Sequence, residues 1–575
     1  MDKMTFSYAG KSISALFSTL ADVESGRSVA VVAAASAARK QVALNSATKK
    51  IGAKKPTKTE EASAQAVAGR AVDAIVAVKA NDSKDKLSRL GSFNENSIPF
   101  LLDDEKNVIT IPTASLIVSA GNASARRSIL SSLRKQFGLE VIQKGFRGKV
   151  LMRASEDGAQ GIQTIQEVLK SFPSKNDAIS PNFLRVCEHR RINAGVISPL
   201  RGRKGISIPT LPWNFQNLGA VGVVGADVKA LGAWTLSKGE PAIRVAVLDE
   251  GVEVRHPSLI AAIIASRDFS GNKPDSSPDG NDAHGTACAG IIASRDLNYP
   301  GLAPNVSLIG ARIARSNPAN PTQWIFDDFN TADAIDWCWD DANADILSNS
   351  WGGGPPSDAI RLAFERARTQ GRAGKGCVIA IAAGNSQSRI PFPGTLANML
   401  VVGASNQWDE RKTKTSRDGE NWWGSCFGPT LSLLAPGVKI KTTDIAGAAG
   451  YTTINFVDTF NGTSSATPQV AAASALVLSI NKNLKENQVR KILTSTCDPV
   501  LGTNEEVGSG RLNLEAALEK AKKSLRETTQ NLKTKTKTKT SKAAKPSSNS
   551  KPKVKAKATA EATKKAINKA RHARI

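Results

Sequence analysis

The 575-residue sequence has few cysteines and lacks the spacings in which cysteines usually act together. Its six cysteines are spread over more than 300 residues, and no Cys-x-x-Cys pair occurs. This distribution excludes the dense disulfide framework of a small secreted domain. Reduced thiols and a few disulfides are both compatible with it. Reduced thiols are the simpler interpretation, because several cysteines stand in apolar runs, where a free thiol acts as a small hydrophobic group.

The sequence also lacks a long apolar run. No stretch approaches the roughly 18 consecutive apolar residues from which a membrane-spanning helix is predicted. The first 22 residues contain Lys3 and Lys11 and no uncharged apolar run of the length found in secretory signals. We therefore expect no transmembrane segment and a cytoplasmic location, with secretion by a non-standard route as the open alternative.

Acidic residues are scarce at the C-terminal end. Residues 521–575 contain 18 Lys and Arg against two Glu, a net charge of +16 out of +26 for the whole chain. Few apolar groups remain there to offset the entropy of ordering, so a disordered Lys-rich tail is predicted. Such a tail can bind nucleic acid or another acidic surface through salt-dependent electrostatics. It contains no aromatic residue on which bases could stack, which argues against specific recognition.

Changes in composition divide the chain into five segments: 1–105, 106–188, 189–220, 221–520 and 521–575. The first is rich in Ala, Ser and Lys, and its pattern predicts helices at Ser12–Asp22 and Ala62–Lys79 or partly disordered chain. The third is a linker with the basic pair Arg190-Arg191. It is a natural place for the chain to be cut, although a solvated basic loop that is never processed explains it equally.

Residues 106–188 predict a β-α-β-β-α-β order, which is the order of the ferredoxin-like α+β unit. The predicted elements are four strands and two helices, at Ala114–Ala120, Ala123–Phe137, Glu140–Gln143, Gly148–Arg153, Gly161–Phe172 and Ala178–Val186.

Residues 221–520 predict a three-layer α/β domain. Near-continuous apolar strands alternate with helices, which indicates a mainly parallel sheet covered on both faces. The predicted strands are Ile243–Leu248, Ser307–Ile313, Ile346–Asn349, Val378–Ala382, Met399–Gly403 and Leu431–Leu434, and the clearest helices are Asn330–Trp339 and Asp358–Gln370.

Three side chains suited to acyl transfer occur in this domain in the order Asp249, His284, Ser464. Asp249 ends an apolar strand, where open α/β sheets place their ligands. His284 precedes a run of small residues, and its unperturbed pKa of about 6.5 suits a general base. Ser464 opens an Ala-rich helix, so it is either a nucleophile or an ordinary N-cap, and its neighbour Ser465 competes for either role.

Asn385 adds a fourth candidate group between the histidine and the serine. It follows an apolar strand and Gly384, so its amide can project from a tight turn as an oxyanion donor, although a plain loop residue is the common alternative. Each signal is weak alone. The ordered set is more specific, since Asp, His and Ser follow the chain order of subtilisin.

Six short segments carry a family resemblance: Asp249-Glu-Gly-Val, Asp282-Ala-His284-Gly-Thr, Leu347-Ser-Asn-Ser350-Trp351-Gly352, Ala383-Gly-Asn385, Gly462-Thr-Ser464-Ser-Ala-Thr-Pro468 and Gly508-Ser-Gly510. Through them, residues from about 210 to 520 resemble the catalytic domain of subtilases, the subtilisin- and kexin-like S8 serine peptidases. Residues 106–188 resemble the propeptides that precede such domains. The serine motif of the family selects Ser464 over Ser465.

The resemblance implies a serine endopeptidase that is made as a zymogen and acts on polypeptides. Ser464 is then the nucleophile, His284 the general base and Asp249 the carboxylate that orients it. Asn385 and the Ser464 backbone N–H form the oxyanion hole. Ser350, Trp351 and Gly352 bind the extended backbone of the substrate.

Some positions depart from the family pattern. Ser465 replaces the usual methionine, and Gly353-Gly-Pro-Pro stands where kexin-like members have acidic residues, so dibasic specificity is not implied. No catalytic group is missing, which argues against an inactive scaffold. No cofactor is expected. Family loops often bind Ca²⁺, and Asp275–Asp282 is the candidate segment, with a solvated acidic loop as the alternative.

Overall fold

The computed structural model describes residues 3–8, 11–18, 98–103, 108–156, 158–172, 178–188, 211–271, 273–317, 320–447 and 449–527. The chain divides into two units, Met1–Lys523 and Ser524–Ile575. The predicted helix at Ala62–Lys79, most of the basic linker and nearly all of the predicted disordered tail therefore lie outside the described residues.

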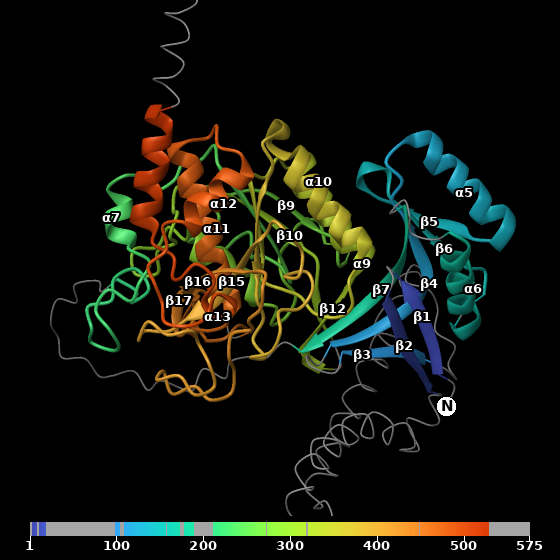
Figure 1. Cartoon of the computed structure of the whole chain (residues 1–575), viewed down its shortest axis with the longest axis horizontal. Coiled ribbons are helices and arrows are strands. Elements are labelled where there is room, and N and C mark those ends of the chain that lie inside the picture. Colours follow the sequence, from blue (N-terminus) through green and yellow to red (C-terminus); the bar gives the residue numbers. More distant parts are fainter. Residues whose placement is uncertain are drawn as a thin grey trace, which may run out of the picture. The chain divides into compact units, whose positions relative to one another are not determined.

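A seven-stranded, entirely parallel sheet forms the centre of the larger part of the first unit, in the order β16-β15-β14-β13-β8-β10-β9 (Figure 1). Its strands are β8 (Arg244–Asp249), β9 (Ile263–Asp268), β10 (Ser307–Arg312), β13 (Ile346–Asn349), β14 (Val378–Ala382), β15 (Leu400–Ser405) and β16 (Leu431–Pro436). All six predicted strands are confirmed to within two residues at each end. The edge strand β9 was not predicted, because its partly exposed residues lack a continuous apolar run.

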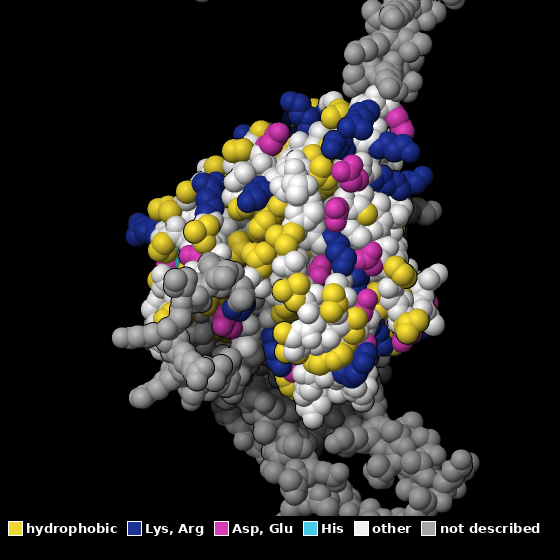
Figure 2. Space-filling model, turned by 90° about the vertical axis from the view of Figure 1, so that its left-hand side faces the viewer, with side chains coloured by type: hydrophobic (Ala, Val, Ile, Leu, Met, Phe, Trp, Pro, Cys, Tyr) yellow, Lys and Arg dark blue, Asp and Glu magenta, His cyan; other side chains and the backbone are white. Residues whose placement is uncertain are grey.

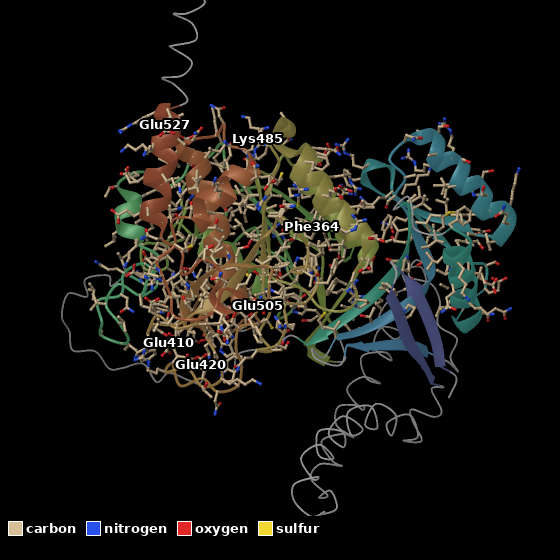
Figure 3. The ribbon with its side chains drawn as sticks, in the orientation of Figure 1. Phe364, Glu410, Glu420, Lys485, Glu505 and Glu527 are labelled. Carbon is tan, nitrogen blue, oxygen red and sulfur yellow. The ribbon has the colours of Figure 1, made fainter. Side chains whose placement is uncertain are left out.

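Helices cover both faces of this sheet, so the predicted three-layer α/β architecture is confirmed. Side chains of β8 alternate between two cores, with Val245 and Val247 in one and Ala246 and Leu248 in the other. The first core includes α8 (His284–Ala293), α11 (Thr463–Ile480) and α12 (Glu486–Thr494), and the second includes α9 (Asp328–Asp340) and α10 (Asp358–Gly374). Phe364, labelled in Figure 3, is fully buried on the inner face of α10.

Shorter elements complete this part of the chain. They are the helices α7 (Ala230–Trp234) and α13 (Asn504–Val507) and the antiparallel pair β17 (Ile440–Thr443) and β18 (Phe456–Phe460).

A second sheet is antiparallel and carries the helices α5 (Ala123–Phe137) and α6 (Gly158–Ser171). Its strands are β1 (Lys3–Tyr8), β2 (Lys11–Ser18), β3 (Ile98–Asp103), β4 (Val108–Val118), β5 (Glu140–Lys144), β6 (Val150–Arg153), β7 (Ile179–Glu188), β11 (Arg315–Asn317) and β12 (Asn320–Asp327). A short 3₁₀ helix, Phe146–Gly148, separates β5 from β6. The order from β4 to β7 is β-α-β-β-α-β, as the sequence of residues 106–188 predicts.

The helix predicted at Ser12–Asp22 is wrong over its described part. Lys11–Ser18 instead forms β2, which pairs with β1 on one side and with β3 on the other. Alanine and leucine in this stretch favour a helix by intrinsic propensity. Pairing with β3, about 80 residues away in the sequence, overrides that preference, because strand formation depends on such neighbours more than on local propensity.

Strand β7 joins the predicted segments 106–188 and 221–520. It pairs antiparallel with β4 of its own segment and with β12 of the second segment. The register sets Trp324 opposite Cys187 and Phe326 opposite Arg185. Neither β11 nor β12 was predicted. Because β12 pairs with β7, the end of β7 lies beside the loops at the carboxyl edge of the parallel sheet.

Charged side chains of both signs are intermixed on the face shown in Figure 2, with small groups of hydrophobic residues between them. Across the described ranges, no helix is sufficiently long and apolar to span a membrane. All six cysteines lie in the described part of the chain and none forms a disulfide, as the simpler interpretation of the sequence expects.

Candidate active site

A cavity of about 360 Å³ opens where β13 and β14 end. Six of the seven predicted site residues line it: His284, Ser350, Trp351, Gly352, Asn385 and Ser464. The seventh, Asp249, lies behind His284. A larger cavity of about 510 Å³ lies between β5, β9 and β12, but none of the predicted site residues lines it. The chemistry therefore favours the smaller cavity as the functional site.

Asp249 and His284 form a buried pair. Asp249 ends β8, and its two carboxylate oxygens lie 2.9 and 3.1 Å from His284 Nδ1. His284 opens α8, and its backbone N–H donates to the Glu250 carboxylate at 2.7 Å, so Glu250 caps the helix. Burial disfavours the imidazolium, but the adjacent Asp249 carboxylate, together with Cys288, more than offsets it and raises the pKa of His284 well above its usual value.

Ser464 lies in the first turn of α11, on the same cavity as His284. Its Oγ makes a long contact of 3.5 Å with the Ser350 carbonyl oxygen, which a rotation about one side-chain bond would release. Ser465, in contrast, is fully buried and donates from Oγ to the Gly462 carbonyl at 2.9 Å. The local geometry thus agrees with the motif in favouring Ser464 over Ser465.

Asn385 follows β14 and is fixed by its side-chain oxygen. Oδ1 accepts from the backbone N–H of Thr463 at 2.8 Å and from its hydroxyl at 3.0 Å. This leaves Nδ2 as the donor group of the amide, close to Gly462. Gly462 has φ +112°, and a Cβ at this position would lie 3.2 Å from Asn385 Nδ2. A glycine is therefore required beside the amide.

Ser350, Trp351 and Gly352 follow β13, and their contacts with the rest of the chain differ. Ser350 Oγ donates to the Ser464 carbonyl at 3.1 Å, which ties this segment to α11. The Trp351 ring stacks on Phe364 at 6.1 Å and is mostly buried, so its indole belongs mainly to the core. Gly352 has no room for a side chain, because a Cβ there would lie 2.9 Å from the Phe392 carbonyl oxygen.

Sequence reasoning did not assign a role to three residues beside the dyad. Trp324 of β12 contacts the His284 ring edge-on at 4.9 Å, Tyr451 lines the cavity, and Cys288 Sγ lies 3.9 Å from His284 Nδ1. Burial raises the pKa of the Cys288 thiol and of the Tyr451 phenol. The i, i+4 spacing of His284 and Cys288 on a helix could have indicated their contact. Trp324 had no such signal, because β12 was not predicted.

In the segment Asp275–Asp282, the calcium candidate of the sequence, two of the three aspartates are already engaged by cationic side chains. Asp279 accepts hydrogen bonds from Lys273 and Arg312, and Arg312 also contacts Asp282 at 3.2 Å. Asp282 further accepts the Ser316 backbone N–H, and burial raises the pKa of its carboxyl to about 6. The Asp279 and Asp282 carboxylates are thus occupied by Lys273 and Arg312, which leaves Asp275, an acceptor of the Ser277 backbone N–H, as the remaining carboxylate for a calcium ion.

These features define a class of site. A histidine backed by a buried carboxylate, a serine in the first turn of a helix and the amide of Asn385 meet at one cavity at the carboxyl edge of a parallel sheet, which is the constellation of serine hydrolases.

Comparison with known proteins identifies the family. The profile of the Subtilase family, peptidase S8, matches residues 240–513. A calcium-dependent protease of Nostoc sp. is 32% identical over 337 residues, which cover 52% of this chain and 48% of that protein. Subtilisin of Bacillus pumilus is 32% identical over 284 residues, covering 48% of this chain and 91% of that protein.

Thermitase of Thermoactinomyces vulgaris is 28% identical over 296 residues, covering 51% of this chain and 94% of that protein. The chain belongs to the subtilase family. It spans about half the length of the calcium-dependent proteases that it matches, and nearly all of the shorter subtilisin and thermitase.

Proposed function

We propose that this chain is a serine endopeptidase that cleaves polypeptides through Asp249, His284 and Ser464. The observation that carries the proposal is the buried Asp249–His284 hydrogen bond at a cavity lined by Ser464 in the first turn of α11. The family assignment supports the same chemistry, because the matching subtilisin and thermitase are nearly fully covered by the alignment.

The geometry supports the following steps. His284 Nε2 accepts the hydroxyl proton as Ser464 Oγ bonds to the peptide carbonyl carbon, and the carbonyl electrons move to oxygen. Asn385 Nδ2 and the Ser464 backbone N–H stabilise that oxyanion. Its collapse expels the amine, which takes the proton from His284, and a water molecule then hydrolyses the acyl-enzyme by the same sequence. Asp249 holds Nδ1–H and stabilises the imidazolium.

The cavity also bears on the substrate. Among the described residues that line it, none is Asp or Glu, and seven are aromatic: Trp324, Phe326, Trp351, Trp422, Trp423, Tyr451 and Phe460. A Lys or Arg side chain of a substrate would therefore lose its hydration without gaining a carboxylate partner. We infer that the site prefers uncharged side chains over basic ones.

We further propose that the chain is made as a zymogen, with the propeptide-like segment 106–188 as the inhibitory domain. Val108 and Cys187, at the two ends of this part, both line the cavity, and Cys187 Sγ lies 3.9 Å from the Gly352 carbonyl oxygen. Pairing of β7 with β12 brings this strand alongside the site. A substrate needs the same space, so the domain must move away before peptides can bind.

Two buried ion pairs support this inhibitory contact. Arg185 of β7, 1% exposed, donates to both carboxylate oxygens of Asp328 at 2.6 and 3.0 Å and to the Gly353 carbonyl at 2.8 Å. Lys149, also 1% exposed, contacts Asp333 at 3.1 Å and the Asp336 carboxylate. Both pairs join residues 108–188 to α9.

The Arg185→Met variant is expected to release the domain more readily. It leaves Asp328 without its partner only while the domain is docked, and removing one member of a buried pair costs about 3–5 kcal/mol. At about 1.4 kcal/mol per factor of ten, the open population should rise by about 100-fold or more. The early rate at which a fluorophosphonate labels the intact 575-residue band measures this rise. Arg134→Ala, on the exposed side of α5, is the control. Equal labelling rates for all three proteins would contradict the inhibitory role.

A direct test of the proposed function is covalent labelling. A fluorophosphonate should modify the purified protein at Ser464, as peptide mapping by mass spectrometry would show, and should abolish casein hydrolysis in proportion. N-terminal sequencing of the active form should find a start beyond Met1. Casein hydrolysis that survives complete labelling would refute the assignment, and an active form that starts at Met1 would refute required maturation.

The alternative function, polyanion binding through residues 521–575, has no support from the comparisons, and nearly all of that segment lies outside the described residues.

A further inference from the structure

A lysine is fully buried in the loop that follows β15. Lys412 is 0% exposed, and its Nζ lies 3.1 Å from Oδ1 of Asp418, whose side chain is also 0% exposed. Lysine is almost never fully buried unless it is paired. Burial of both charges would cost more than their attraction returns unless further hydrogen bonds complete the site.

Those further partners are backbone and hydroxyl oxygens. Nζ lies 2.5 Å from the Thr413 carbonyl, 2.6 Å from that of Glu420 and 3.2 Å from that of Trp423. The Ser416 hydroxyl oxygen follows at 3.4 Å. With the Asp418 carboxylate, five oxygen atoms surround an ammonium that has only three protons to donate. A shell of carbonyl, hydroxyl and carboxylate oxygens is the kind of ligand set that binds a hard metal cation.

The same loop is connected to the catalytic serine. Glu420, labelled in Figure 3 with Glu410 of the same loop, accepts from Trp423 Nε1 at 2.7 Å and from Asn461 Nδ2 at 2.9 Å. Asn461 lies three residues before Ser464. Trp422, Trp423 and Asn461 all line the cavity. The shell around Nζ thus fixes the backbone of this loop. From that backbone Trp422 and Trp423 extend as an aromatic wall of the cavity, and Glu420 extends to Asn461.

We propose that Lys412 is an internal cation that occupies a metal-like site and positions this wall of the cavity without a bound metal ion. A relative is named a calcium-dependent protease. In this chain a basic side chain occupies both oxygen-rich loops described above, since Lys273 also contacts the Ser277 and Pro278 carbonyls and Asp279. Lys412 is a positioning residue, and its effect on catalysis rests on the proposed function, whereas its role in the loop does not.

Two variants separate the charge of Lys412 from its volume. Lys412→Ala removes the ammonium and opens space for a small cation, while Lys412→Met fills that space with an uncharged chain. In metal-free buffer with choline chloride, the Tm of both should fall by about 5–10 °C, because Asp418 and the carbonyls lose their cation. Potassium, calcium or methylammonium chloride at equal ionic strength should restore most of that loss in Lys412→Ala only, since a ligand that binds the folded state stabilises it.

The wild type and Arg417→Ala, which removes an exposed ion pair of the same loop, should have the same Tm in all four salts. Cations that raise the Tm of Lys412→Met as much as that of Lys412→Ala, or that leave Lys412→Ala at its choline value, would overturn the proposal. For peptide hydrolysis, Lys412→Ala should raise KM more than it lowers kcat, and the restoring cations should reverse this. If no protein hydrolyses peptides, the proposed function fails, while the Tm comparison still decides the role of Lys412.

Discussion

Replacement of Ser464 by alanine is expected to lower kcat for peptide hydrolysis by about 10⁶-fold, a magnitude known from subtilisin, a relative of this chain. The physical reason is that no other hydroxyl in the first turn of α11 is placed to attack. Among the described residues, the Ser464 Oγ has one long hydrogen-bond contact, with the Ser350 carbonyl, so stability should change by less than about 1 kcal/mol. Hydrolysis of casein and of a chromogenic peptide would give the loss, and urea unfolding would verify the fold.

Ser465→Ala is the matched control, because it makes the same chemical change one residue further along the helix. It removes the buried hydrogen bond to the Gly462 carbonyl, which should cost about 1 kcal/mol of stability. Activity should remain within about tenfold of the wild type, since Ser465 Oγ is held by the Gly462 carbonyl and Ser465 is not among the residues that line the cavity. If Ser465→Ala were inactive and Ser464→Ala active, the nucleophile would have been misassigned, although the family would stand.

The parallel sheet could be predicted because each of its central strands is a short apolar run that local pattern detects. Strands β13 and β14 were predicted at their observed ends, and their carboxyl ends carry Ser350 and Asn385. The small residues that flank His284 and Ser464 could also be recognised from the sequence. They are small because α8 and α11 are buried and tightly packed, which leaves little volume for larger side chains. These parts of the site depend on short segments of sequence.

Other parts depend on contacts between distant segments, which pattern alone does not reveal. Strand β12 forms an antiparallel pair with β7, about 140 residues earlier, and its Trp324 therefore reaches His284. Lys412 has an ordinary charged neighbourhood in the sequence, and only folding of the loop surrounds it with carbonyl oxygens. The paired state of Asp279 and Asp282 likewise follows from Arg312 on β10.

Replacement of Asp249 by asparagine should lower kcat for peptide hydrolysis by about 10⁴-fold. The amide can donate to His284 Nδ1 where the carboxylate accepts, which would leave the proton on Nε2 and remove the base that Ser464 needs. Asp341→Asn, at the exposed end of α9, removes a charge without touching the site and should keep full activity.

The pH dependence distinguishes this electrostatic role from a merely structural one. Burial lowers the pKa of His284, and Asp249 raises it well above its usual value of about 6.5. Because catalysis needs the neutral imidazole, kcat/KM of the wild type should rise with pH through a midpoint above about 6.5. Asp249→Asn removes the largest of the contributions that raise this pKa, while burial still lowers it, so the midpoint of its residual activity should fall below that of the wild type.

The interaction of Asp249 with His284 should make folding stability fall as pH rises, whereas it makes activity rise with pH. A raised pKa in the folded state means that the folded chain binds the proton more tightly than the unfolded chain. The stabilisation is therefore complete below the unfolded pKa of about 6.5 and is lost as pH rises through the higher pKa of folded His284. In urea unfolding, the wild type should lose this increment with rising pH, and Asp249→Asn should not. Parallel stability curves, together with equal activity midpoints, would show that Asp249 does not control the charge of His284. The histidine would then owe its basicity to other groups of the site.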